Sequence, residues 1–206
     1  MVEKNSLFRG IKVSYAKICS PTDSDFASKS AELDMGSIAF AVLGLGDLTK
    51  GARQRVEFFL QIKSQFQVLI DVYGGGSSLE ELEVYAECSQ LSIHGFIEDP
   101  FSHFHKKHLD KPSFYLGFSL YEGLHMAVVD AARYGVPSLL SDIPAHRELQ
   151  KLAGSPLLIC QNSEDAVAVL RAAIASRSSF VAAQSAALNM ANCFADLANS
   201  SEVLSL

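Results

Sequence analysis

From residue 37 onward the sequence predicts an α/β fold, with a parallel sheet of about six strands and helices on both faces. Short, continuous apolar runs such as SIAFAVLGL at 37–45 alternate about six times with amphipathic segments. Continuous apolar runs are typical of strands that are buried on both faces. Regular alternation of such strands with helices requires crossover connections, and these produce a parallel sheet.

Each predicted element follows from its own local pattern. The strands are apolar runs that end in glycine or in a polar turn, at 37–45, 67–76, 91–96, 113–118, 137–142 and 155–160. The helices carry apolar residues at helical spacing with charges between them, at 51–66, 77–90, 99–110, 143–152, 163–176 and 179–201. One more helix is expected within 119–137, with its apolar run from Met126 and its end at Gly135 and Pro137. The helix at 77–90 also has serines at its start and acids in its first turn, which favour a helix N-terminus.

The composition excludes several classes of protein. The chain has 206 residues, of which 49% are hydrophobic and 19% charged, so it can form a substantial core. A net charge of −6, with no tryptophan and no basic stripe, argues against nucleic-acid binding. The apolar runs are far shorter than the roughly 20 residues of a membrane span, and the first residues lack the apolar core of a signal peptide. Four widely spaced cysteines without a CxxC pair predict reduced thiols in the cytoplasm, with neither a zinc site nor a disulfide framework.

The domain organisation is simple. Residues 1–36 are polar and weakly patterned, which predicts a linker or interdomain segment with at most a short strand at Ile11–Ala16. Residues 37–206 form the predicted α/β domain. In such domains ligands bind beyond the carboxyl ends of the strands, so the strand-to-helix turns are the place to look for chemistry.

The turn containing EGLHM holds the most distinctive acids. Glu122 precedes a helix start whose backbone N–H groups form a natural anion site. Gly123 is expected to let the backbone turn sharply there. Asp130 lies about five residues into the helix, roughly 7–8 Å further along its axis. A diphosphate at the helix start would then have hydroxyl groups near both acids. A plainer interpretation is equally open: Glu122 is a solvated loop acid and Asp130 pairs with Arg133.

Two other glycine-containing turns follow buried strands. GLGDLTKG offers Lys50 as a cation for phosphate, although a lone lysine in such a loop is more often simply solvated. It matches neither a P-loop nor a G-x-G-x-x-G turn. The YGGGSS turn fits a tight turn better than a phosphate-binding loop.

Histidines raise a possible metal site. His94, His103, His105 and His108 lie close together in sequence, but no carboxylate or cysteine completes a convincing ligand set, so a flexible basic surface segment is the preferred interpretation. His125 stands apart because it occupies the turn expected to face phosphate. It could donate to a phosphate or a sugar hydroxyl, or be a neutral residue at the helix start.

Together these motifs resemble a known family. FYLGFSLYEGLHMAVVDAARYGVPSLLSDIPAHRE resembles the signature segment of family 4 retaining glycosyltransferases, P-S-x-x-E-G-F-G-L-x-x-x-E-A-x-A-x-G-x-P-V. AFAVLGLGDLTKGA resembles their G-R-x(5)-K-G segment, VLIDVYGGGSSLEELE their second strand and glycine loop, and LSIHGFIED their base-contacting loop. The resemblance covers roughly 37–200 and is most specific over 115–148. It implies the Rossmann-like C-terminal half of a GT-B fold, which holds the nucleotide-sugar donor.

The resemblance also implies roles for individual residues. Glu122 matches the first acid of the E-x7-E motif, which contacts the transferred sugar, and Asp130 matches the second, which holds the ribose hydroxyls. Lys50 matches the phosphate-binding lysine, so Lys50 and Glu122 are the expected catalytic pair. Glu148 matches the last acid of the signature, with no defined role. Further donor-binding positions are Gly46, Phe96, Ile97, Gly123, Leu124, His125 and Met126.

Three positions depart from the family's pattern. Leu45 stands where the family has arginine, Asp130 replaces the second glutamate, and His125 replaces a glycine. A missing charged contact to phosphate weakens binding by about 1.5–3 kcal/mol. These departures are compatible with a divergent enzyme and also with a non-catalytic relative.

The resemblance implies the donor-binding domain of a hexosyl-type retaining glycosyltransferase in polysaccharide synthesis, transferring to a saccharide or lipid-linked acceptor. It implies no metal and no cofactor beyond the nucleotide-sugar substrate. The acceptor domain is expected on a longer chain or a partner chain, and without it the isolated domain is expected to be inactive. The expected location is the cytoplasm, peripheral to the inner membrane face through that partner. The alternatives are a glycosyltransferase-like partner or regulatory domain and, less well supported, a sugar-nucleotide enzyme such as an epimerase.

Overall fold

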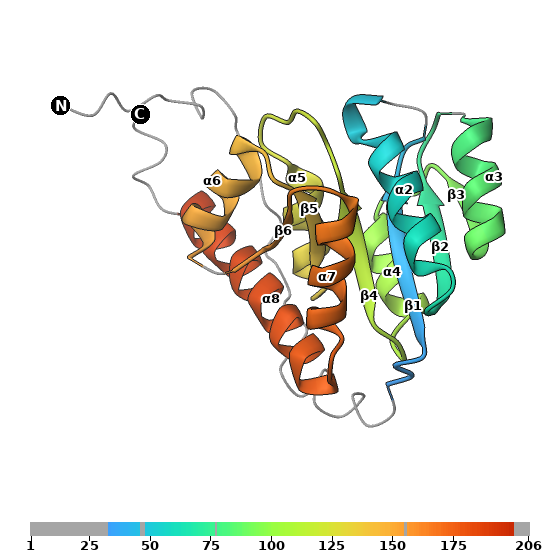
Figure 1. Ribbon diagram of the computed structural model, residues 1–206. Coiled ribbons are helices and arrows are strands. Elements are labelled where there is room, and N and C mark those ends of the chain that lie inside the picture. The colour runs from blue at the N-terminus through green and yellow to red at the C-terminus, as the bar shows by residue number, and fades with distance from the viewer. Residues whose placement is uncertain (1–32, 46–47, 77, 155, 200–206) are drawn as a thin grey trace.

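A computed structural model describes residues 33–45, 48–76, 78–154 and 156–199 (Figure 1). The strands of this part form one parallel sheet in the order β3-β2-β1-β4-β5-β6. Their bounds are β1 Ser37–Leu43, β2 Gln67–Tyr73, β3 Gln90–Gly95, β4 Ser113–Gly117, β5 Ser138–Ser141 and β6 Leu158–Cys160. The order reverses between β1 and β4, as in a doubly wound Rossmann-like sheet. The predicted fold class is therefore confirmed.

The helices connect successive strands and then close the domain. Their bounds are η2 Leu48–Lys50, α2 Ala52–Ile62, α3 Leu79–Cys88, α4 Pro100–Lys107, α5 Met126–Arg133, α6 Pro144–Ala153, α7 Ser163–Ala173 and α8 Arg177–Asn199. The predicted helix at 51–66 is shorter than expected, since it begins after Gly51 and ends at Ile62. Gly51 has a φ of +73°, which separates the 3-10 turn η2 from α2.

The helices cover the sheet on two faces. In Figure 1, α2, α3 and α7 lie on the near face, and α4 and α5 lie on the far face. Each face has its own cluster of buried side chains, and α8 contributes Phe180 to the first cluster and Met190 to the second. Among the described residues no single helix is long and apolar enough to cross a bilayer; Ser163–Ala173 and Arg177–Asp196 meet that test only as a pair bent by 108°.

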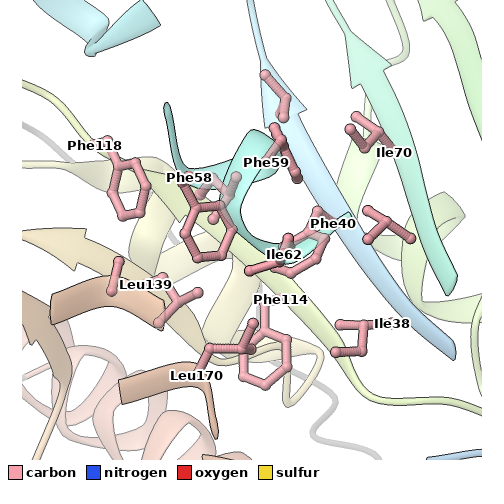
Figure 2. Packing of buried hydrophobic residues seen from close by; sticks show 14 of the residues in the cluster. Ile38, Phe40, Phe58, Phe59, Ile62, Ile70, Phe114, Phe118, Leu139 and Leu170 are labelled. Atoms are coloured by element: carbon pink, nitrogen blue, oxygen red, sulfur yellow. The ribbon is translucent and has the colours of Figure 1, made fainter. Parts of the chain in front are cut away.

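The first cluster is built around an aromatic residue of the central strand (Figure 2). The ring centroid of Phe40 lies 5.6 Å from that of Phe58, 5.4 Å from that of Phe59 and 6.0 Å from that of Phe114. Alternate residues of β1 point to the opposite face, where the small Ala39 belongs to the second cluster. The core thus fixes β1 and β4 beside each other, which determines where their following loops meet.

The glycine loop after β2 packs against the loop after β1. Gly76 has a φ of +104°, and a Cβ there would lie only 2.2 Å from the carbonyl oxygen of Leu45. The backbone N–H of Leu45 in turn donates to the carbonyl of Gly75 over 3.3 Å. This close backbone contact explains Gly76 and favours the tight-turn interpretation.

The histidine-rich segment forms the helix predicted at 99–110, but its interpretation as a flexible surface segment is wrong. Residues 100–107 form α4, capped at its start by Asp99, and His108 is buried directly after it. The His108 Nε2 lies 2.6 Å from the Oδ2 of Asp71, a carboxylate buried inside β2. Lys107 Nζ contacts the other oxygen of Asp71 at 2.5 Å, and the His94 Nε2 contacts that same oxygen. A buried carboxylate needs donors, so His108 is buried, and the partly exposed side chains of His94 and Lys107 reach inward to Asp71.

The predicted linker at 1–36 falls largely outside the described residues, and so does the predicted strand at Ile11–Ala16. At its end, Leu33 and Met35 pack against the first cluster, and the backbone N–H of Asp34 donates to the carbonyl of Asp110 over 2.8 Å.

Candidate functional site

The loops after β1 and β4 meet at the point where the strand order reverses. Lys50 comes from the first loop and Glu122 from the second, and the Lys50 ammonium forms an ion pair with the Glu122 carboxylate. In doubly wound sheets, the crevice at this reversal is where ligands bind. Two of the residues selected from sequence are therefore in contact at the expected place.

Backbone contacts hold these two loops together. The N–H of Leu120 donates to the carbonyl of Thr49 over 2.8 Å. A Cβ on Gly51 would lie 1.6 Å from the carbonyl oxygen of Phe118, so only glycine fits there. Lys50 is thus carried by a loop whose backbone is pressed against the loop that carries Glu122.

A buried arginine holds the backbone of the loop that carries Lys50. Arg55 is 2% exposed, and its guanidinium donates to the carbonyl of Lys50 over 2.7 Å and to the carboxylate of Glu81 over 2.7 Å. The Tyr85 hydroxyl donates to the same Glu81 oxygen over 2.7 Å. The sequence analysis missed Arg55, although its spacing offered a signal. It lies three residues before Phe58 in the apolar stripe of α2, where an arginine is unexpected unless it is paired.

Glu122 is an ionised acceptor in a largely enclosed position. Its side chain is 11% exposed, and it accepts hydrogen bonds from Lys50 and, over 2.8 Å, from the Ser119 hydroxyl. Burial disfavours the charged form, but the hydrogen bonds from Lys50 and Ser119 outweigh it, so the pKa of Glu122 lies below its ordinary value. The interpretation of Glu122 as a solvated loop acid is therefore wrong.

The His125 side chain points into the protein rather than toward a phosphate. It is 5% exposed, with its Nε2 3.0 Å from the Tyr115 hydroxyl and its Nδ1 2.8 Å from the Nε2 of His146. Burial lowers the pKa of His125 to about 4, although the nearby Glu122 opposes the shift. Donation from this ring to a phosphate, one of the two interpretations from sequence, is wrong because both nitrogens are engaged. The neutral helix-start interpretation agrees with this geometry.

The helix start itself is tighter than expected. The backbone N–H of Met126 donates to the carbonyl of Leu124 over 2.8 Å, so this amide does not point freely outward. The φ of Gly123 is not in the left-handed region, and a Cβ added there would meet nothing within 4 Å. The backbone does bend at Gly123 and Leu124, as expected, but the chain itself does not require a glycine for that bend. The space beside Gly123 is open.

Asp130 lies on the exposed side of α5 rather than in its buried stripe. Its side chain is 46% exposed, and its Oδ1 is 3.8 Å from an Nη1 of Arg133. Partial burial, reinforced by the negative charge of Asp99, raises the pKa of Asp130 above its ordinary value, while Arg133 opposes this. The predicted pairing with Arg133 is present but loose, and the carboxylate remains accessible to a ligand.

The remaining predicted positions are spread around this edge. Phe96 is 90% exposed, while Ile97 packs partly against the second cluster. Glu148 is exposed on α6. Leu45, at the position of the family's arginine, is 7% exposed and belongs to the first cluster. Gly46 lies outside the described residues.

The described part of the chain offers no ready metal centre. No group of three or more histidine, cysteine, aspartate or glutamate side chains within it is arranged to hold a metal ion.

Comparison with known proteins places this arrangement in a structural context. No protein-family model and no curated protein matches the sequence. Solved structures do match. The fold is that of the C-terminal domain of GT-B glycosyltransferases. The C-terminal domain of LpcC from Francisella tularensis, a group 1 glycosyl transferase, has a TM-score of 0.57 and 15% identity, over 84% of this chain and 90% of that one.

Two longer neighbours were solved with nucleotide. TarM from S. aureus, in a complex that includes UDP, has a TM-score of 0.58 and 16% identity over 82% of this chain. HepE from Anabaena, with UDP and glucose, has a TM-score of 0.60 and 14% identity over 91% of this chain. The present chain spans only 37% of the TarM chain and 51% of the HepE chain. At these identities the likeness establishes the fold, and the activity is argued from the site.

Proposed function

We propose that this chain binds a nucleoside diphosphate sugar as the donor domain of a retaining glycosyltransferase. The observation that carries the proposal is the ion pair of Lys50 and Glu122, which come from two separate loops and meet at the sheet reversal. Asp130 adds an accessible carboxylate further along α5. A cation beside two acceptors matches the charge and hydroxyl groups of such a donor.

Each residue has a distinct role in this proposal. Lys50 holds the diphosphate and stabilises the charge that develops on it as the sugar leaves. Glu122, as a fixed acceptor, binds a hydroxyl of the transferred sugar, and Asp130 binds the ribose hydroxyls. The donor phosphate itself takes the proton from the acceptor, so we assign no protein base or nucleophile. We propose no metal, since Lys50 supplies the positive charge for the diphosphate.

The donor is proposed to be a UDP-hexose. TarM and HepE were solved with UDP, and HepE also with glucose, which supports this choice. Their likeness to this chain is one of fold, so the base and the sugar are matters for experiment. Phe96 and Ile97, which follow β3, are the proposed contacts of the base.

The acceptor is proposed to lie on another domain or chain. The chain spans about a third to a half of the longer neighbours, as an isolated donor half would. We propose that transfer to a saccharide or lipid-linked acceptor, in polysaccharide synthesis on the cytoplasmic side of a membrane, requires that second half. The isolated domain is expected to bind donor but not to transfer sugar.

A second candidate function is a non-catalytic glycosyltransferase-like partner. It is favoured by Leu45, a buried core residue at the position where the family places a phosphate-binding arginine. The accessible Asp130 and the paired Lys50 and Glu122 favour donor binding instead. Donor binding does not by itself establish catalysis, so a positive result is compatible with both candidates. An absence of binding contradicts only the donor-domain proposal.

Calorimetry is the experiment that tests the proposal. UDP, GDP, ADP and their sugar conjugates are titrated into the wild type, Asp130→Ala and the control Asp110→Ala. Asp110 has a 63% exposed side chain and precedes β4, at the opposite edge of the sheet. We expect one nucleotide to bind the wild type and the control, and Asp130→Ala to weaken it at least about tenfold. No binding to folded wild type at millimolar ligand would contradict the donor-domain proposal and favour the non-catalytic partner.

A further inference from the structure

The tautomer of His146 is fixed by its partner. Its Nδ1 lies 2.7 Å from the carbonyl oxygen of Ser141. A carbonyl oxygen can only accept, so the Nδ1 of His146 must carry a proton. The ring is 0% exposed, and burial lowers its pKa, so it is neutral and its Nε2 must be an acceptor.

The tautomer of His146 determines which atoms of His125 and Tyr115 donate a hydrogen bond. The Nδ1 of His125 lies 2.8 Å from the Nε2 of His146 and must donate to it. Neutral His125 then has a lone pair on Nε2, which accepts from the Tyr115 hydroxyl over 3.0 Å. Burial raises the pKa of the Tyr115 hydroxyl, which therefore keeps its proton. The hydrogen bonds run in one direction, from Tyr115 through both rings to the Ser141 carbonyl.

This chain of hydrogen bonds surrounds the turn that carries Glu122. Tyr115 belongs to β4, His125 precedes α5, His146 lies on α6, and Ser141 ends β5. The Ser141 hydroxyl also donates to the carbonyl of Ser119, whose own hydroxyl donates to Glu122. The turn is therefore attached to three neighbouring elements by polar contacts inside the protein.

The packing at this position is close as well. A Cβ on Gly117 would lie 3.0 Å from the Cε1 of His125 and 2.7 Å from the Cδ2 of Leu140. The Nε2 of His125 is 3.7 Å from the Oε1 of Glu122. Neutral His125 presents no N–H to that carboxylate, since its Nε2 is occupied by Tyr115. Lys50 and Ser119 therefore remain the donors to Glu122.

We propose that His125 and His146 are positioning residues, a neutral pair of fixed tautomer that holds the 117–125 turn and keeps Glu122 paired with Lys50 and Ser119. The role in donor binding rests on the proposed function, whereas the pair itself does not. In its protonated form, His125 would lose its acceptor for Tyr115 and direct an N–H toward Glu122. The carboxylate would then be drawn away from Lys50.

The tautomers are tested by ¹⁵N NMR of the histidine rings in the free protein near pH 7. We expect His125 and His146 both to carry their proton on Nδ1, the less common tautomer in water. The Tyr115→Phe variant removes one hydroxyl with little change in volume, and it should alter the signals of His125 while the protein stays folded. An Nε2-protonated ring, or rapid exchange between tautomers in folded wild type, would overturn the proposal.

The positioning of Glu122 is tested by its own carboxyl titration, followed by ¹³C NMR. In His125→Phe we expect the pKa of Glu122 to rise toward its ordinary value, because the turn no longer holds the carboxylate against Lys50. The control is Arg147→Ala, which removes an exposed pair with Asp142 on the same helix as His146. An unchanged Glu122 titration in folded His125→Phe contradicts the positioning role. If His125→Phe does not fold, the same titration is made in Tyr115→Phe.

Donor binding supplies the functional readout. UDP and UDP-glucose are titrated into wild type, His125→Phe and Arg147→Ala. We expect the wild type to bind UDP-glucose more tightly than UDP. In His125→Phe, the ratio of the Kd for UDP to the Kd for UDP-glucose should fall at least about fivefold, while the Kd for UDP itself changes little. If the wild type binds neither ligand, the proposed function fails, and the ring and carboxyl signals still decide the proposal on the histidine pair.

Discussion

Lys50 and Glu122 lie 72 residues apart in sequence, yet their side chains form an ion pair between the loops that follow β1 and β4. The two strands are neighbours only because the sheet order reverses between them. Lys50 is 42% exposed while Glu122 is 11% exposed, so the lysine lies nearer the surface and the acid is more enclosed. We therefore expect the partly exposed Lys50 side chain to be accessible to an incoming anion.

Replacing the lysine of this pair is expected to affect binding more than stability. Lys50→Met should change the free energy of unfolding by less than about 1 kcal/mol, because ion pairs of half-exposed lysines contribute little. It should raise the pKa of Glu122 and weaken nucleotide binding at least about tenfold. Urea unfolding and calorimetry measure the two effects. Lys63→Met, which removes a 3.8 Å exposed pair with Glu87, is the control. Equal binding by Lys50→Met and Lys63→Met would exclude Lys50 from the site.

The buried pair of Arg55 and Glu81 is expected to matter for folding. Arg55→Met should lower the free energy of unfolding by about 3–5 kcal/mol, because it leaves the Glu81 carboxylate buried without its cation. Arg53→Met removes a pair between exposed side chains on the same helix, and it should cost less than about 0.5 kcal/mol. Urea denaturation gives both values. Similar losses in the two variants would show that burial does not govern the strength of the Arg55 pair.

Replacing two glycines near the site with alanine is expected to change the stability of the fold to very different extents. Gly51→Ala should destabilise the fold by more than about 2 kcal/mol, because φ is +73° and the Cβ would overlap the Phe118 carbonyl. Gly123→Ala should change stability by less than about 0.5 kcal/mol, because its Cβ meets nothing within 4 Å. If the diphosphate approaches beside Gly123, the second variant should nevertheless bind nucleotide less tightly. Thermal unfolding and calorimetry separate the two effects.

Stability is expected to fall on mild acidification because of the buried histidine pair. The pKa of His125 is about 4 when folded, against 6.5 as its ordinary value, so the unfolded chain binds more protons between these two values. The free energy of unfolding should therefore decrease as pH falls from about 6.5 to about 4, by on the order of 2–3 kcal/mol. His146 contributes in the same direction. Urea unfolding at several pH values measures this slope, and His125→Phe should flatten it. A slope unchanged by that substitution would assign the acid sensitivity to other groups.

The carboxylate inside β2 is expected to be a second point of sensitivity. Asp71 is 1% exposed and holds His108, Lys107 and His94 around it. Burial opposes its ionisation, but the hydrogen bonds from His108, Lys107 and His94 keep the pKa of Asp71 well below its ordinary value.

Asp71→Asn should therefore lower the free energy of unfolding by about 1.5–3 kcal/mol, the usual range for hydrogen bonds to a charged group. Asp110→Asn, at an exposed pair with Lys111, should have almost no effect. Chemical denaturation of the two variants tests this comparison. If Asp71→Asn leaves the free energy of unfolding unchanged, the surrounding donors have found other acceptors.

The sequence alone determined the fold class, the order of the elements and the edge where a site should lie. These follow from apolar periodicity and from glycine turns, which are local properties of the chain. It also selected Glu122, an acid in a strand-to-helix turn, and Asp130, an acid within an apolar helix. Lys50 was selected through the resemblance of its loop to the family's lysine segment. The boundaries were less well predicted. The helix α2 starts where expected but ends at Ile62 rather than at 66, because the chain turns there and Phe66 packs against the first cluster before β2 begins.

Only the tertiary structure decided which side chains point inward and which of them meet. His125 looked accessible in sequence but is buried against His146, and the histidines near Asp71 looked like surface residues. Arg55 was missed because its partner Glu81 lies on another helix. The physical reason is common to all three. A buried polar group is stable only with a partner, and in a doubly wound sheet that partner comes from an element distant in sequence, so local patterns cannot reveal it.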